Sequence, residues 1–150
     1  MVDQTDSVVD IAQFLFDQLD DNKTPLGLTD VFYGDQEKIP RVPAVAVESG
    51  TKSREINGAP RRTLNTITAY LIIYHSKIDA SVQVTRKEVD LLAEAVESLV
   101  HSNSTMDGLV IHSLVTEIQS GYSAKGKTDI YRSARLTVTA TSQSQLPLAR

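Results

Sequence analysis

Two amphipathic helix patterns and four strand patterns predict an α+β fold, in which a mainly antiparallel four-stranded sheet is flanked by two main helices. Their order along the chain is helix, strand, strand, helix, strand, strand, and the short polar connections favour antiparallel pairing. The 150 residues are 41% hydrophobic and 23% charged, which is ordinary for a globular protein. We therefore expect a single domain over residues 1–150.

The helices are predicted from apolar residues that recur at helical spacing. The first covers about residues 6–20, where Asp6 or Ser7 can cap the N-terminus. The second begins near Thr85, because Thr85-Arg-Lys-Glu88 matches the capping-box pattern. The predicted core-facing residues of the two helices are Val8, Ile11, Ala12, Leu15, Leu19, Val89, Leu92, Ala93, Val96, Leu99 and Val100.

The first two strands are predicted at residues 43–48 and 63–75. The shorter one has a proline at its start, which suits an edge strand or the first position of a strand. Between them, residues 49–62 contain Gly, Asn-Gly and Pro and more bases than acids, so we expect a flexible basic arm. In the longer strand, residues Ile67, Ala69, Leu71 and Ile73 are predicted to face the core, opposite Tyr70, Ile72 and Tyr74.

The second face of the 63–75 strand is amphipathic. Tyr70, Ile72 and Tyr74 lie on it. Either these side chains contact a neighbouring subunit, or the first helix covers them.

The segment Gly121–Thr128 matches the phosphate-binding pattern G-x-x-x-x-G-K-[ST] at every fixed position. A working phosphate loop lies between a strand and a helix, whose N-terminus faces the phosphates. Here residues 109–118 predict a strand, and residues 129–141 alternate with period two, which predicts another strand. We therefore expect a hairpin rather than a nucleotide site, followed by a polar tail from about residue 143.

The sequence predicts no catalytic, cofactor or metal site. It contains no cysteine, and hence no thiolate nucleophile or cysteine-based zinc site. His75, His101 and His112 have no second histidine or carboxylate at helical ligand spacing. No apolar run approaches the roughly 18 residues of a membrane span, and no signal peptide is evident. We expect a non-enzymatic protein that is not bound to a membrane.

Charge is distributed unevenly along the chain. Residues 1–37 hold nine acids and one lysine, whereas residues 38–62 hold six bases and two acids. This predicts two surfaces of opposite potential, or else solvated loops and helix faces. A protein partner explains the basic segment better than a nucleic acid does, because residues 49–62 contain no aromatic side chain for stacking. The predicted partner-binding residues are Lys52, Arg54, Arg61, Arg62, Lys125 and Lys127.

The order of these elements resembles that of the tail terminator, or tail completion, proteins in the neck of long-tailed bacteriophages. The resemblance covers about residues 5–140 and includes the Pro-Ala-Val-Ala-Val-Glu48 strand, the polar arm up to Arg62, and the strand ending Ala-Tyr-Leu-Ile-Ile-Tyr-His75. It continues through the helix at residues 88–100 and the two final strands.

The resemblance implies a small α+β subunit of the virion, made in the host cytoplasm. Six copies would form a ring that caps the tail tube protein, joins it to the head connector and passes DNA without specific binding. Replacing Arg54, Arg61 and Arg62 by glutamate is then expected to abolish capping of the tail tube. The alternative is a small non-enzymatic α+β module that binds a protein or nucleic-acid partner, and self-assembly separates the two.

Overall fold

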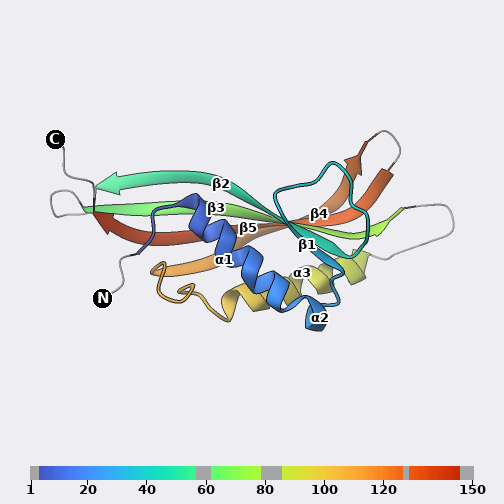
Figure 1. Ribbon diagram of the computed structural model, residues 1–150, viewed down its shortest axis with the longest axis horizontal. Coiled ribbons are helices and arrows are strands. Elements are labelled where there is room, and N and C mark those ends of the chain that lie inside the picture. Colours follow the sequence, from blue (N-terminus) through green and yellow to red (C-terminus); the bar gives the residue numbers. More distant parts are fainter. Residues whose placement is uncertain (1–3, 57–61, 79–85, 127–128, 146–150) are drawn as a thin grey trace.

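The computed structural model describes residues 4–56, 62–78, 86–126 and 129–145. It shows an α+β domain in which the helices cover one face of a single sheet (Figure 1). The elements are α1 (Val8–Asp21), α2 (Lys23–Leu26), β1 (Asp30–Tyr33), β2 (Ala44–Ile56), β3 (Arg62–Lys77), α3 (Arg86–His101), β4 (His112–Lys125) and β5 (Asp129–Gln145).

The sheet is mixed and has five strands in the order β1-β2-β3-β5-β4. β1 and β2 are parallel, and all other neighbours are antiparallel. The α+β class is thus confirmed, but the sheet has five strands in place of the predicted four, and the predicted order of six elements is wrong. The missed strand β1 has only four residues and the missed helix α2 also has four, which is too short for a period to show in the sequence.

The main core lies between the sheet and helices α1 and α3. α1 begins at Ser7, whose hydroxyl oxygen accepts a hydrogen bond from the Val9 amide at 3.2 Å, as expected of an N-cap. All the predicted helix stripe residues are buried or pack partly against this core. The sheet contributes Val45, Val47, Ile67, Ala69, Leu71, Ile73, Val115, Ala134, Leu136, Val138 and Ala140.

A second, smaller cluster covers part of the opposite face of the sheet. Tyr74 is only 1% exposed there, and its ring meets the Tyr131 ring edge to face at 5.7 Å. The loop at residues 34–43 supplies Ile39 to this cluster. Both expectations for Tyr74 are therefore wrong, since a loop of the same chain and not a subunit or α1 covers it. Burial of the Tyr74 and Tyr131 rings stabilises the loop in this position.

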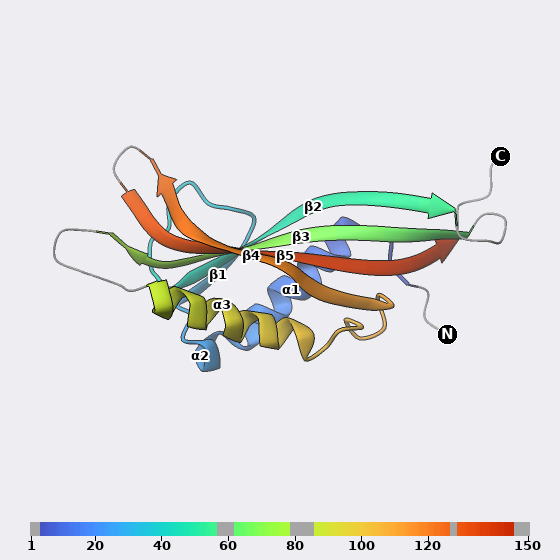
Figure 2. The ribbon, with the colours of Figure 1, turned by 180° about the vertical axis from the view of Figure 1, so that it is seen from behind.

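Three strands continue together beyond the helices (Figures 1 and 2). We call this part the distal ribbon; it comprises residues 52–56 of β2, 62–67 of β3 and 140–145 of β5, paired side by side.

The limits predicted for the arm and for the tail need correction. Residues 49–56 belong to β2, with Ile56 opposite Thr63 in β3, and β5 extends to Gln145. Residues 57–61 and the tail beyond residue 145 lie outside the described residues. The continuation of the predicted strand over residues 49–56 was missed because this half of β2 is largely exposed, so its sequence shows no alternation of apolar and polar residues.

β4 and β5 form the expected antiparallel hairpin, with Lys125 opposite Asp129. β5 and not a helix follows the segment Gly121–Thr128, which therefore lacks the following helix that a phosphate loop requires. β4 begins at His112 rather than at residue 109, because a turn with positive φ at Met106 and Asp107 precedes it. None of the helices in the described ranges combines the length and apolar character needed to cross a membrane.

Candidate interaction surfaces

The predicted partner-binding residues lie at two ends of the sheet and do not form one patch. Lys52, Arg54 and Arg62 belong to the distal ribbon, whereas Lys125 lies at the end of β4 next to the β4–β5 turn (Figure 1). Arg61 and Lys127 lie outside the described residues. The charges that were grouped by type in the sequence are therefore separated by the length of the sheet.

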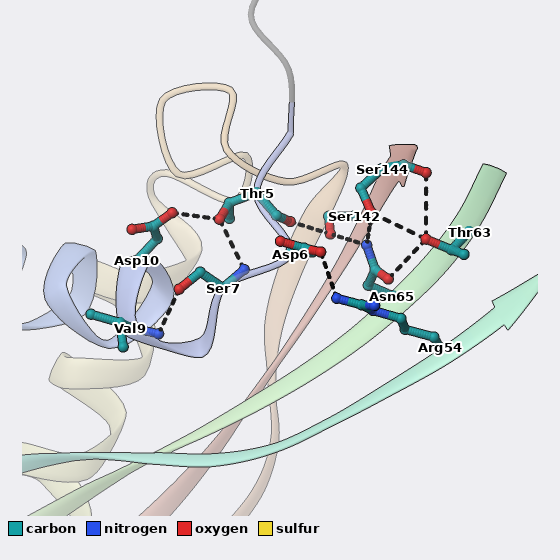
Figure 3. Close-up of polar contacts among 10 residues, drawn as sticks. All are labelled: Thr5, Asp6, Ser7, Val9, Asp10, Arg54, Thr63, Asn65, Ser142 and Ser144. Carbon is teal, nitrogen blue, oxygen red and sulfur yellow. Dashed lines mark hydrogen bonds and ion pairs between the residues drawn. The ribbon is translucent and has the colours of Figure 1, made fainter. Parts of the chain in front are cut away.

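Arg54 is paired with the N-terminal segment of its own chain. Its guanidinium lies 2.6 Å from the Asp6 carboxylate (Figure 3). The next residue back, Thr5, is held by β5, because the Ser142 hydroxyl donates to the Thr5 carbonyl at 2.5 Å. The segment before α1 thus lies across the distal ribbon and fastens it to the helix.

A buried polar network lies beneath that segment. The Asn65 amide donates to the hydroxyls of Ser142 at 3.2 Å and Ser144 at 2.8 Å (Figure 3). The Thr63 hydroxyl donates to the side-chain amide oxygen (Oδ1) of Asn65 at 3.2 Å. Because Asn65 and Ser142 are both 0% exposed, these bonds satisfy groups that would otherwise be costly to bury. The ribbon is therefore held by directed polar contacts where the helices no longer cover it.

Lys125 also pairs with a residue of its own chain, in a cluster on the face of the sheet away from the helices. Its ammonium group lies 2.6 Å from Asp35, and their side chains are 14% and 25% exposed. The Tyr74 hydroxyl donates to the other Asp35 oxygen at 2.6 Å. Burial first, and then this hydrogen bond, raises the pKa of Tyr74 well above its ordinary value, which keeps the phenol protonated as a donor. The cluster fastens the hairpin to the loop at residues 34–43.

Of the predicted residues within the described ranges, Lys52 and Arg62 are exposed, and neither has a charged partner among the described residues. They are the two basic groups of that set that the fold leaves available on the distal ribbon. The sequence could not predict that Arg54 pairs with Asp6 or that Lys125 pairs with Asp35, because the partners are 48 and 90 residues apart.

The histidines serve separate local roles. His101 closes α3 against β4, since its Nε2 accepts a hydrogen bond from the Val115 amide at 2.9 Å. Burial lowers the pKa of His75 from its ordinary 6.5, against the opposing effect of the Glu88 carboxylate, and Arg132 lowers it further. In the part of the chain that the structure describes, no group of three or more His, Cys, Asp or Glu side chains could hold a metal ion.

We expect the stability of the protein to fall in acid partly through His75. Its pKa is lower in the folded state, so the unfolded chain binds the extra proton as pH drops below about 6.5. The stabilising contribution is present at pH 7.5 and is lost between pH 6.5 and the lowered pKa. His75→Gln should therefore reduce the difference between urea midpoints measured at pH 7.5 and pH 5. An unchanged difference would contradict this role.

Two hollows flank the edge strand β4, one on each face of the sheet. The larger has a cavity volume of about 610 Å³ and lies between β4 and the loop at residues 34–43. The smaller, of about 170 Å³, lies on the helix side. Ser120, Gly121 and Tyr122 line both.

Arginines border both hollows: Arg135 the larger, and Arg86 and Arg132 the smaller. None of them was predicted from the sequence. Arg86 and Arg132 are far apart in the sequence, and only the packing of α3 against the sheet brings them to one hollow.

No protein-family model matches the sequence, and no curated protein matches it significantly. A functional proposal therefore rests on the geometry of the chain and on the resemblance in element order.

Proposed function

We propose that the chain is a structural subunit of a long-tailed bacteriophage, six copies of which form a ring that caps the tail tube and joins it to the head connector. The observation that carries the proposal is a sheet with two different open edges. One is the outer edge of β4 from His112 to Ile118. The other is β2 beyond Val47, since β1 pairs only with Ala44–Val47 and no other strand of the described residues lies beside residues 49–56.

Two unlike edges suit a ring. Closed rings other than dimers need head-to-tail contacts between different patches of the same subunit. Open strand edges present unpaired N–H and C=O groups that pair readily with another chain. This part of β4 also exposes apolar side chains at Leu114 (40%) and Ile118 (36%), which supplies area that an interface would bury.

The charge of the helix layer supports a role around DNA without binding it. The α1 segment contains four acids and no base, and the α3 segment contains four acids and two bases. Because DNA is itself densely negative, such a surface repels it. On this proposal the subunit is made in the host cytoplasm, resides in the tail or neck of the virion, and acts without enzymatic chemistry or a cofactor.

The alternative is a small non-enzymatic α+β module that binds a protein or nucleic-acid partner. The hollow of about 610 Å³ beside β4 favours it, because binding sites are concave. A module of this kind has no need to assemble with itself, so oligomeric state separates the two functions.

The double variant Lys52→Glu, Arg62→Glu is expected to lose tube capping. Both side chains are exposed on the distal ribbon and have no partner among the described residues. Arg54 is left intact, because replacing it would also break its ion pair with Asp6. Tail tubes assembled from the tube protein of the same phage should stop growing with the wild-type chain and return to uncapped lengths with the variant, as seen by electron microscopy.

The matched control is Lys38→Glu, Lys87→Glu, which changes the net charge equally at two exposed positions away from the distal ribbon. It should cap as the wild type does. Normal capping by the ribbon variant would remove the distal ribbon charges from the proposed contact.

A further inference from the structure

We infer that β4, between Gln119 and Lys125, binds an extended segment of a partner protein by strand addition, and that a carboxylate of this segment enters the smaller hollow between Arg86 and Arg132. The inference holds whether or not the chain forms a ring. It rests on the open edge of β4, on an unexplained glycine and on two arginines that face a hollow without an acid.

The edge of β4 is open along this stretch, with hollows on both sides. All seven residues from Gln119 to Lys125 line the larger hollow, and the central Ser120, Gly121 and Tyr122 also line the smaller one. Successive side chains of an added strand point to opposite faces of a sheet. A strand paired with β4 would therefore place alternate side chains in the two hollows, the arrangement by which strand addition obtains both affinity and specificity.

Gly121 has no role that the fold of this chain explains. Its backbone is not in the positive-φ region, and a Cβ built there would meet nothing within 4 Å. A glycine inside a strand weakens that strand, and it often marks a place where another backbone or a ligand approaches closely. Gly121 lies within the proposed contact and lines both hollows.

The smaller hollow offers two guanidinium groups and no acid. Arg132 lies over the Tyr122 ring at 5.0 Å and donates to the Tyr122 hydroxyl at 3.1 Å. No carboxylate of the described residues pairs with it. Among the described residues, Arg86 has one long ion-pair contact of 3.7 Å, with Asp90, and Asp90 accepts a hydrogen bond from the Ser120 hydroxyl at 2.7 Å. Arginine binds carboxylates by directed, charge-assisted hydrogen bonds, so this hollow selects an acidic side chain.

The larger hollow does not select an acidic side chain. Asp35 already neutralises Lys125 there, and Glu48 lines it together with Arg135. Arg135 stacks over the Tyr70 ring at 3.9 Å. The partner segment is therefore expected to carry acid at the positions that face the helices and uncharged residues at the alternate positions.

The test begins with a displayed library of random nine-residue peptides, selected on the immobilised wild-type chain. Enriched peptides should share one Asp or Glu within an alternating pattern rich in β-branched residues. Binding of the leading peptide should slow hydrogen exchange in residues 119–125. Changing its acid to the amide should weaken binding at least tenfold, a comparison that requires no variant of the protein.

The Arg86→Gln, Arg132→Gln variant should lose affinity by a similar factor. Lys52→Gln, Arg62→Gln is the matched control, with the same charge change at the far end of the sheet, and it should bind as the wild type does. Failure to enrich peptides, enriched peptides without an acid, equal binding by the arginine variant, or protection outside residues 119–125 would each overturn the inference. Pairing of β4 with β4 of a second copy in solution would also overturn it.

Discussion

Replacing Leu71 by alanine is expected to lower the free energy of unfolding by about 2–5 kcal/mol. Leu71 is 0% exposed at the centre of β3 and belongs to the main core. Its neighbours across the sheet are Val47 and Leu136, both also 0% exposed. Because backbone hydrogen bonds hold these strands in register on both sides, the site cannot collapse around the cavity that alanine leaves.

The control is Leu114→Ala, the same truncation on β4, where the side chain is 40% exposed. It should change the free energy of unfolding by no more than about 0.5 kcal/mol. Urea denaturation of both variants supplies the measurement, provided that the slope with denaturant is unchanged. Equal losses at the two positions would contradict the placement of the core on the helix side of β3.

Replacing Asp35 by alanine is expected to cost about 1–3 kcal/mol. The substitution removes the acceptor of the Tyr74 hydroxyl and the partner of Lys125 together. Tyr74 is 1% exposed, and the Lys125 side chain is 14% exposed, so water does not readily replace the lost oxygen atoms. Amide exchange should also accelerate in the loop at residues 34–43, since this cluster fastens it to the hairpin.

Asp20→Ala is the matched control for a carboxylate in an ion pair. Asp20 lies 3.5 Å from Lys23, and both side chains are nearly half exposed. Such surface ion pairs contribute about 0–1 kcal/mol to stability. If thermal or urea unfolding showed the same loss for Asp20→Ala as for Asp35→Ala, the cluster around Tyr74 would have no special part in stability.

The helices and the central strands could be predicted because their periods follow directly from burial on one face. The stripe from Ile11 to Leu19 and the alternation from Ile67 to Ile73 both meet the same core. The hairpin was also predictable, since β5 alternates and cannot supply the helix that a phosphate loop requires. These features depend on residues that are near one another in sequence.

The remaining features depend on contacts between distant segments. β1 is too short to show a period, and it is a strand because Val31 and its neighbours pair with β2. Beyond Ile67 and Ala140, the distal ribbon lacks apolar alternation because a buried polar network, centred on Asn65, replaces the apolar core there. The pairing of Arg54 with Asp6 and of Lys125 with Asp35 likewise follows from tertiary packing alone. Of the basic residues predicted from charge composition, Arg54 and Lys125 are therefore paired with acids of their own chain.

The central claim is that this chain is a ring-forming structural subunit, and native mass spectrometry over a concentration series tests it most directly. The proposal predicts a closed assembly of six times 16.4 kDa with few intermediates, as expected for head-to-tail contacts that close. A monomer at every concentration would contradict the self-assembled ring and favour the binding module.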